Sequence, residues 1–564
     1  MKKRLIHIWL FLGLMLLPLG HTVFAESPES HEAAQEEIPD NGIPVLALTI
    51  DPEEFQKVIE SQWHEYQAEN CTIRIDVPEG WSCEYGPVDE ALIGQELRLR
   101  YFRGRGNSTW LEEKKPFKFR LEESADLLSM GANEHWVLMA NAKDESLMRN
   151  RIISYIGDAL GLAYTSKFVP VDLLVNGVYQ GSYLLGEQVR IGENRIEIDK
   201  IKKSQTEEPE ITGGYLLSTS PTGNDPEIGK LTLESGLTFL VESPEFDEYD
   251  EMEQAALSAQ KAYIAAYLQQ VEDAVFGKNA EGASVSDLMD LESAAKYWWV
   301  QTFSFNDEAF ATTSSYLYKL RDGKLYWGPL WDFDRSLWLS ERANFLNKNK
   351  MPWLDHLRAY DPAYQQLLRN SWEQLDAVLE ELIREGGVLD RYSEEIRLSW
   401  EKDYVLWRGK MPMEGEFDAG VERIRQMITL RRKAIRESLD TQLTNVFVTV
   451  TFENEGKILA QEELYAGEEL SEKRFPLAEE KKGYAFLHWA DAQGYIFDKK
   501  TAVDTDMTVH AVYQEIETEA GSETVPDLPD DRTSESSTGR IVIYAAAAAA
   551  VLAGGIFFLR KRKS

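Results

Sequence analysis

Three aspartates near the middle of the chain are the residues whose positions most directly suggest chemistry. Asp307 follows an apolar helical run, and Asp332 and Asp334 follow a second apolar run in the sequence Trp-Asp-Phe-Asp. An aromatic strand pattern and a tight turn at Asp322-Gly323 lie between them, which predicts a β-hairpin. Carboxylates at the ends of apolar elements can hold a divalent cation over a phosphate. The alternative is that these aspartates only cap a helix and end a strand, since Asp is a common boundary residue.

A glycine-containing loop in the first quarter of the chain could bind the phosphate itself. A predicted strand runs into Gly104, Gly106, Asn107 and Ser108. Glycines between a strand and small polar residues let backbone N–H groups approach a phosphate, although the same pattern forms ordinary hairpin turns. The next predicted strand places Lys118 on the face opposite its apolar residues. A glycine loop followed by a strand that presents a lysine is how several phosphotransferase folds hold a nucleotide.

Several short motifs stand in an order that resembles the CotH kinase family, named for spore coat protein H. They are Arg103-Gly104 with Asn107-Ser108, the strand Lys115 to Leu121, Trp136-Val137-Leu138 with Asp144 and Arg149-Asn150, Asn176-Gly177 with Tyr179, Gly181, Tyr183 and Glu187-Gln188, and Trp331-Asp332-Phe333-Asp334. The similarity covers about residues 43–439. It implies an α+β, two-lobed domain with an atypical protein-kinase-like fold, which transfers phosphate from ATP to Ser or Thr of exported proteins.

The resemblance also implies a role for each matching residue. ATP would be bound together with Mg²⁺ or Mn²⁺. The loop of Gly104, Gly106, Asn107 and Ser108 would cover the phosphates, Lys118 or Lys115 would bind them, and Glu187 would lie near the hinge between the lobes. Asp307 would be the catalytic aspartate. Asp332 would bind the metal, with Asp334 beside it.

The chain departs from the family pattern at two places. The family usually supplies an asparagine a few residues after the first aspartate, and residues 312–315 are Thr-Thr-Ser-Ser here. Ser218 stands where an acidic residue is common. A hydroxyl ligates Mg²⁺ only as a neutral donor, so the alternative reading is a weakly active or inactive surface scaffold or adhesin that retains the kinase-like fold.

Both ends of the chain carry targeting patterns. Lysines and an arginine precede an apolar run and Val23-Phe24-Ala25, which predicts a cleaved signal peptide over residues 1–25. Residues 26–42 have the composition of a disordered linker. Residues 541–559 are apolar and precede a basic tail at 560–564, which predicts a single transmembrane helix with a cytoplasmic end. We therefore expect a membrane-anchored ectodomain at the surface of a Gram-positive bacterium.

Charge and cysteine content narrow the class further. The formal net charge of -36 argues against a nucleic-acid partner, which would require a basic surface, and fits an exported protein. The partner that the resemblance implies is an exported or cell-surface protein. The only cysteines, Cys71 and Cys83, flank a predicted hairpin, and in an exported chain such a pair predicts a disulfide. Two buried free thiols are the alternative.

The C-terminal part has a different pattern from the kinase-like domain, which we place at residues 43–440. Residues 445–514 alternate apolar and polar positions and look like a single Listeria–Bacteroides-type module, similar to the internalin B repeat, which implies a small β-rich domain. Residues 515–540 are rich in Glu, Ser, Thr, Pro and Asp, which is typical of a disordered stalk.

Overall fold

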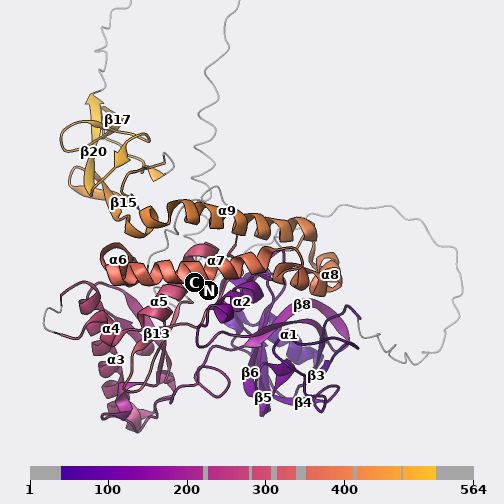
Figure 1. The fold of residues 1–564 in the computed structure, drawn as a ribbon. Coiled ribbons are helices and arrows are strands. Elements are labelled where there is room, and N and C mark those ends of the chain that lie inside the picture. Colours follow the sequence, from indigo (N-terminus) through magenta and orange to yellow (C-terminus); the bar gives the residue numbers. More distant parts are fainter. Residues whose placement is uncertain are drawn as a thin grey trace, which may run out of the picture. The chain divides into compact units, whose positions relative to one another are not determined.

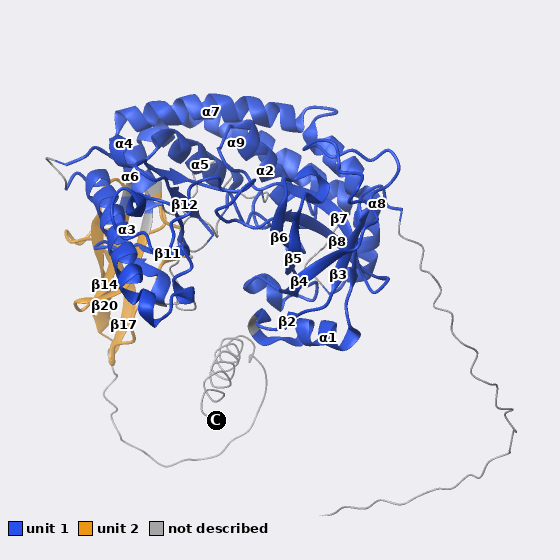
Figure 2. Cartoon of the chain, turned by 90° about the horizontal axis from the view of Figure 1, so that it is seen from below, with its two compact units in different colours: residues 1–448, 464–468 blue, residues 449–463, 469–564 orange. Residues whose placement is uncertain are grey.

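The computed structural model describes residues 40–219, 227–278, 282–306, 314–337, 351–410, 416–471 and 474–515. The chain divides into two compact units (Figure 2), one of residues 1–448 with 464–468 and one of residues 449–463 with 469–564. The catalytic candidate Asp307 lies outside the described residues, as do the predicted signal peptide, most of the two linkers, the C-terminal apolar segment and the basic tail.

The first unit begins with a sheet that closes on itself. Its strands are β1 (Val45–Thr49), β2 (Gln67–Ala68), β3 (Thr72–Asp76), β4 (Leu97–Gly104), β5 (Phe117–Ala125), β6 (Asn133–Met139), β7 (Phe168–Val175) and β8 (Val178–Glu187). The order β4-β3-β1-β7-β8-β6-β5 returns to β4, because β4 pairs with both β3 and β5, and β2 adds to the outside of β4. Seven strands therefore form a closed ring.

The ring overturns the predicted fold class. We expected a two-lobed, kinase-like α+β domain with a transmembrane helix, whereas the protein is a mixed α/β structure whose first sheet is closed, which is not the standard kinase fold. The closure depends on the pairing of β4 with β3 and β5, and on the parallel pairing of β1 with β7. Local sequence patterns do not reveal which distant strands will pair.

Strand β7 shows why the ring holds together. All of its residues are buried, which is expected of a strand covered on both faces. It pairs in parallel with β1 and antiparallel with β8. Asn176 (φ 51°) and Gly177 (φ 83°) make the turn to β8, and left-handed backbone at both positions is what a type I′ hairpin requires. The hairpin predicted at Asn-Gly is confirmed.

A second, open sheet follows the ring in the same unit. Its order is β10 (Lys230–Thr232), β11 (Thr238–Ser243), β9 (Tyr215–Thr219), β12 (Tyr316–Lys319) and β13 (Leu325–Trp327). Strands β12 and β13 are antiparallel and joined through Asp322, whose φ is 48°. This confirms the hairpin predicted between the aspartates, and it places Asp332 and Asp334 soon after its second strand.

Helices cover both sheets (Figure 1). They are α1 (Pro52–Glu60), α2 (Arg149–Ala159), α3 (Gln254–Val275), α4 (Val285–Leu288), α5 (Leu291–Ser304), α6 (Pro352–Tyr360), α7 (Pro362–Ile383), α8 (Val388–Trp407) and α9 (Phe417–Thr444). Helices α2 and α5 lie between the ring and the open sheet, since α2 contacts β7 and α5, and α5 contacts β13 (Figure 2). The aromatic stripe of α5 is core, because Trp298 and Trp299 are buried and the ring of Trp299 lies 4.9 Å from that of Trp372.

A buried ion pair joins helix α8, which carries Asp403, to Lys114 in the loop before β5. Lys114 Nζ lies 2.6 Å from Asp403 Oδ1, and neither side chain is exposed. The carboxylate also accepts a hydrogen bond from the Ser182 backbone N–H at 2.8 Å. Because a buried charge needs a partner, the pair holds the two elements in one register.

The second unit is a small β structure. Its strands are β14 (Phe447–Asn454), β15 (Lys457–Tyr465), β16 (Glu468–Glu469), β17 (Tyr484–Ala490), β18 (Ile496–Phe497), β19 (Ala502–Val503) and β20 (Met507–Glu515). Phe452 stands at the centre of its core, with ring contacts to Trp489 and Phe497. The likeness of this unit to Listeria–Bacteroides-type modules stays a prediction.

Two further predictions need correction. Cys71 and Cys83 are separate thiols, with Cys83 Sγ 3.1 Å from the Leu128 carbonyl oxygen, so the predicted disulfide is not formed. Burial raises the pKa of the Cys71 thiol to about 11. In the described part of the chain, none of the helices combines the length and the apolar character that a bilayer crossing requires. The predicted single-pass membrane anchor is therefore not supported by the described residues, and its helix at 541–559 falls outside them.

Candidate functional site

The glycine loop connects β4 to β5 and is shaped by two close approaches. A Cβ on Gly104 would lie 2.3 Å from the ring of Trp110, which packs over it. Gly106 has a φ of +86°, and a Cβ there would lie 2.3 Å from Thr109 Oγ1. The Arg105 backbone N–H donates to the Pro116 carbonyl at 3.1 Å, which holds the base of the loop. Both positions therefore exclude a side chain.

The second half of the site is the segment after β13. Asp332 has left-handed backbone (φ 68°), and Asn306 Nδ2 donates to its carbonyl oxygen at 3.3 Å. The next backbone N–H, of Phe333, donates to Asn150 Oδ1 on helix α2 at 2.8 Å. Ser314 donates its hydroxyl hydrogen to Asp332 Oδ2 at 3.1 Å. These contacts hold the segment from both sides, so the Asp332 carboxylate has a fixed direction.

The two halves line one cavity of about 630 Å³. The residues that the sequence predicted to act together, and that do line it, are Gly106, Asn107, Ser108, Asp332 and Asp334. Arg105, Arg335 and Asn141 line the same space. The glycine loop and two carboxylates from distant parts of the chain therefore line one cavity.

Lys118 lines a smaller neighbouring cavity of about 200 Å³. The two cavities share wall residues, namely His64, Arg105, Gly106, Tyr316 and Trp331. Burial, together with the nearby Arg103 and Arg105, lowers the pKa of Lys118 to about 8, against the opposing effect of Glu242. The lysine can thus reach a ligand that extends along the shared wall.

Three predicted binding residues, Lys115, Gly104 and Glu187, do not line these two cavities. Lys115 Nζ donates to the Trp110 carbonyl oxygen at 2.7 Å and lies 5.2 Å from the centroid of the Trp110 ring. Gly104 packs beneath that ring and lines neither cavity. Of the two lysines proposed to bind phosphate, only Lys118 lines the cavities just described.

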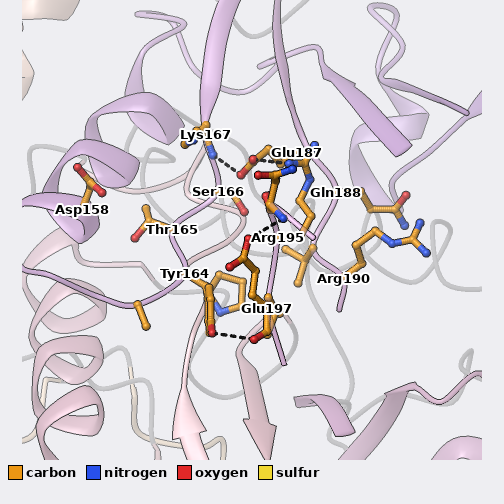
Figure 3. A pocket seen from close by; sticks show the side chains of 15 residues that line it. Asp158, Tyr164, Thr165, Ser166, Lys167, Glu187, Gln188, Arg190, Arg195 and Glu197 are labelled. Atoms are coloured by element: carbon orange, nitrogen blue, oxygen red, sulfur yellow. Dashed lines mark hydrogen bonds and ion pairs between the residues drawn. The ribbon is translucent and has the colours of Figure 1, made fainter. Parts of the chain in front are cut away.

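Glu187 lies in a different pocket of about 300 Å³ (Figure 3). Its Oε1 atom is 2.7 Å from Arg195 Nη1, and its Oε2 atom accepts from the Lys167 backbone N–H at 2.9 Å. Burial raises the pKa of Glu187 to about 7, although Arg195 opposes the shift. These contacts give Glu187 a structural role at the end of β8.

Sequence reasoning assigned no role to several residues around the site. Arg103 belongs to one of the family motifs but has no implied role there, and Arg105 is not part of any of the motifs. Arg103 lies on β4, and Arg105 follows the end of that strand, within the glycine loop. Asn150 belongs to a family motif without an implied role, and Asn306 is distinguished in the sequence only by its position next to Asp307. Ser314 belongs to the Thr-Thr-Ser-Ser departure and forms the hydrogen bond to Asp332 described above.

A divalent cation fits the carboxylates that line the larger cavity. The described residues contain no group of three or more His, Cys, Asp or Glu side chains arranged to hold a metal. Mg²⁺ does not require one, because it is commonly bound through one or two carboxylates together with the phosphates of a substrate and water. Asp332 and Asp334 supply that number, and the glycine loop faces them across the cavity.

A glycine turn and two carboxylates around one cavity, with a lysine in the adjoining cavity, are the kinds of group that phosphotransferases use. The chain belongs to the CotH kinase family, since the family described as CotH kinase protein matches residues 102–435, more than half of the sequence. Membership indicates a kinase-like function, and it implies ATP and a divalent metal in general terms. No curated protein matches the chain.

Proposed function

We propose that the protein is an ATP-dependent protein kinase that phosphorylates Ser or Thr hydroxyls of exported proteins. The observation that carries the proposal is the shared cavity, in which the loop of Gly106 to Ser108 faces Asp332 and Asp334. Family membership supports the same class of reaction. The nature of the acceptor protein is part of the proposal.

The chain's own groups would act by positioning and by balancing charge, which is the main source of catalysis in phosphoryl transfer. Asp332 and Asp334 would hold Mg²⁺ or Mn²⁺, and the bound cation neutralises phosphate charge. The glycine loop would hold the phosphates with its backbone N–H groups. Lys118 would contact them with its ammonium group, and Ser314 would orient the Asp332 carboxylate.

The transfer itself joins the acceptor hydroxyl oxygen to the γ-phosphorus of ATP and breaks the bond between that phosphorus and the β–γ bridging oxygen. ADP leaves with the bridging oxygen. The hydroxyl proton needs an acceptor, and we assign it to the carboxylate of Asp307. Asp307 directly follows Asn306, whose amide donates to the Asp332 backbone, so the chain leads from the cation-binding segment to the proton acceptor.

The test is phosphate transfer by purified protein from γ-labelled ATP, with Mg²⁺ or Mn²⁺, to itself and to a mixture of exported proteins. We expect metal-dependent label in the wild type and its loss in Asp332→Asn and in Asp307→Asn. Asp247→Asn is the matched control, because Asp247 is exposed and lines neither cavity. If the wild type neither binds nor transfers phosphate from ATP, the kinase proposal is wrong and the scaffold alternative holds.

A further inference from the structure

The wall of the smaller cavity carries a concentration of positive charge that the predicted site did not include. Arg103 on β4 lies directly opposite Lys118 on β5 in the antiparallel register. Side chains of directly opposed residues project from the same face of the sheet, and like charges in such a pair destabilise it. Arg105, two residues further along, lines the same cavity. Three cations therefore share one wall.

None of these three cationic groups forms an ion pair with a carboxylate of the described residues. Asp332 and Asp334 oppose the effect of burial on the pKa of Arg105, and Glu242 does so for Lys118, so these carboxylates act at longer range. Within the described residues, the side chains of Arg103, Arg105 and Lys118 form no hydrogen bond or ion pair, and Arg103 Nε is buried without a partner. The guanidinium of Arg105 instead lies 5.5 Å from the centroid of the Trp331 ring. Two buried arginines elsewhere in the chain are paired with acids, Arg149 with Asp144 and Arg151 with Glu84.

This arrangement is unusual for so acidic a chain. The sequence has 96 Asp and Glu residues against 60 Lys and Arg residues, so counter-ions are abundant. Among the residues found to line the smaller cavity, Glu242 is the one carboxylate, and it accepts a hydrogen bond from the Ser218 hydroxyl at 2.7 Å. Asp332 and Asp334 act on Arg105 from the adjoining cavity, so the wall formed by Arg103 and Lys118 has Glu242 as its carboxylate and keeps an excess of positive charge. A bound anion would supply the missing charge.

The position of Arg105 decides the form of that anion. Arg105 lines both the smaller cavity and the larger one, where Asp332 and Asp334 lie. A compact anion would satisfy only part of the cluster, whereas a chain of linked phosphates can contact cations along the whole wall. Guanidinium groups also bind phosphate oxygens through two parallel hydrogen bonds, which a lysine does not match.

We propose that Arg103, Arg105 and Lys118 form a cradle that binds a polyphosphate chain and prefers it to a single phosphate. As part of the kinase, the cradle would select nucleoside triphosphates over monophosphates by their phosphate chain. Its biological ligand thus rests on the proposed function. The cradle itself is a property of the β4–β5 wall and can be measured without nucleotide, cation or catalysis.

The experiment is calorimetric titration of the full chain with inorganic tripolyphosphate and with orthophosphate in metal-free buffer. Removing metal leaves Asp332 and Asp334 without attraction for the anion, so binding reports the cradle. We expect the wild type to bind tripolyphosphate more tightly than orthophosphate, and Arg103→Met to weaken tripolyphosphate binding by about tenfold or more. The matched control is Arg98→Met, an exposed arginine on the same strand, with a change of less than about twofold.

Thermal unfolding without ligand separates lost binding from lost folding. Since Arg103 and Lys118 repel each other, we expect Arg103→Met to unfold at the same temperature as the wild type or higher. Equal affinity of Arg103→Met and Arg98→Met for tripolyphosphate would overturn the cradle, as would equal wild-type affinity for the two anions. Tripolyphosphate binding that depends on Arg103 in a protein that fails to transfer phosphate from ATP would leave the cradle standing and remove the kinase. If Arg103→Met transfers phosphate from ATP as well as the wild type does, the kinase proposal stands and the cradle proposal is wrong.

Discussion

Ser314 donates a hydrogen bond of 3.1 Å to Oδ2 of Asp332 and lines the same cavity. The Thr-Thr-Ser-Ser sequence replaces the asparagine that is usual in the family. Its Ser314 nevertheless contacts Asp332, so this replacement does not leave the carboxylate without a polar neighbour. In the proposed function Asp332 binds the metal, and the Ser314 hydroxyl would orient its carboxylate. Residues that hold a metal ligand in this way commonly contribute substantially to metal affinity.

Ser314→Ala should therefore weaken cation use. We expect the Mg²⁺ concentration for half-maximal phosphate transfer to rise by about tenfold, because the Asp332 carboxylate loses a fixed partner. Activity at saturating Mg²⁺ should fall less. Ser314→Thr keeps the hydroxyl and is the control, with near wild-type Mg²⁺ dependence. Identical Mg²⁺ curves for the wild type and Ser314→Ala would contradict the orienting role.

Gly106→Ala should damage the glycine loop through a specific contact. The added Cβ would meet Thr109 Oγ1 at 2.3 Å, in addition to the cost of a side chain at φ +86°. We expect ATP affinity to fall together with a loss of roughly 1–3 kcal/mol in the free energy of unfolding. Gly236→Ala is matched, because Gly236 has φ +89° and open space around its Cβ position. If both variants bind ATP equally well, the loop does not contact the phosphates.

The sequence could predict the parts of the site but not their full assembly. Asn176-Gly177 and Asp322-Gly323 identify hairpins because their turn chemistry is local. The closure of the ring joins strands far apart in the chain, β1 with β7 and β6 with β8. The placement of Arg103 opposite Lys118 depends on the strand register, and a shift of one residue would move every side chain to the other face. Glu187 illustrates the same limit, since its contacts with Arg195 and Lys167 are visible only in the folded protein.

Glu187→Gln should affect stability rather than ATP binding. The carboxylate is buried against Arg195 at 2.7 Å, so the neutral amide leaves a buried guanidinium without its partner. We expect the free energy of unfolding to fall by about 3 kcal/mol. The KM for ATP should stay within about twofold of the wild-type value, because Glu187 lines a separate pocket. A large rise in KM with unchanged unfolding would restore Glu187 to the nucleotide site.

Lys118 predicts how anion binding depends on pH. Burial and the neighbouring arginines lower its pKa to about 8 from an ordinary 10.5, so the ammonium loses its charge just above neutrality in the free protein. Binding of tripolyphosphate in metal-free buffer should therefore weaken as pH rises through about 8 and beyond, and Lys118→Arg should flatten this part of the profile because arginine stays charged. Calorimetric titrations from pH 7 to 9 would measure both profiles.

The free energy of unfolding should also depend on the protonation of Lys118, but it should rise with pH where tripolyphosphate binding weakens. Between about pH 8 and 10.5 the unfolded chain binds a proton at Lys118 that the folded chain does not, so this residue makes the free energy of unfolding rise with pH across that window. Lys118→Met removes the titrating group and hence this contribution, which denaturant unfolding at pH 8 and pH 10 would detect as a smaller difference between the two values. A wild-type difference that Lys118→Met leaves unchanged would show that Lys118 keeps its ordinary pKa, and the crowded β4–β5 wall would then have no electrostatic effect on it.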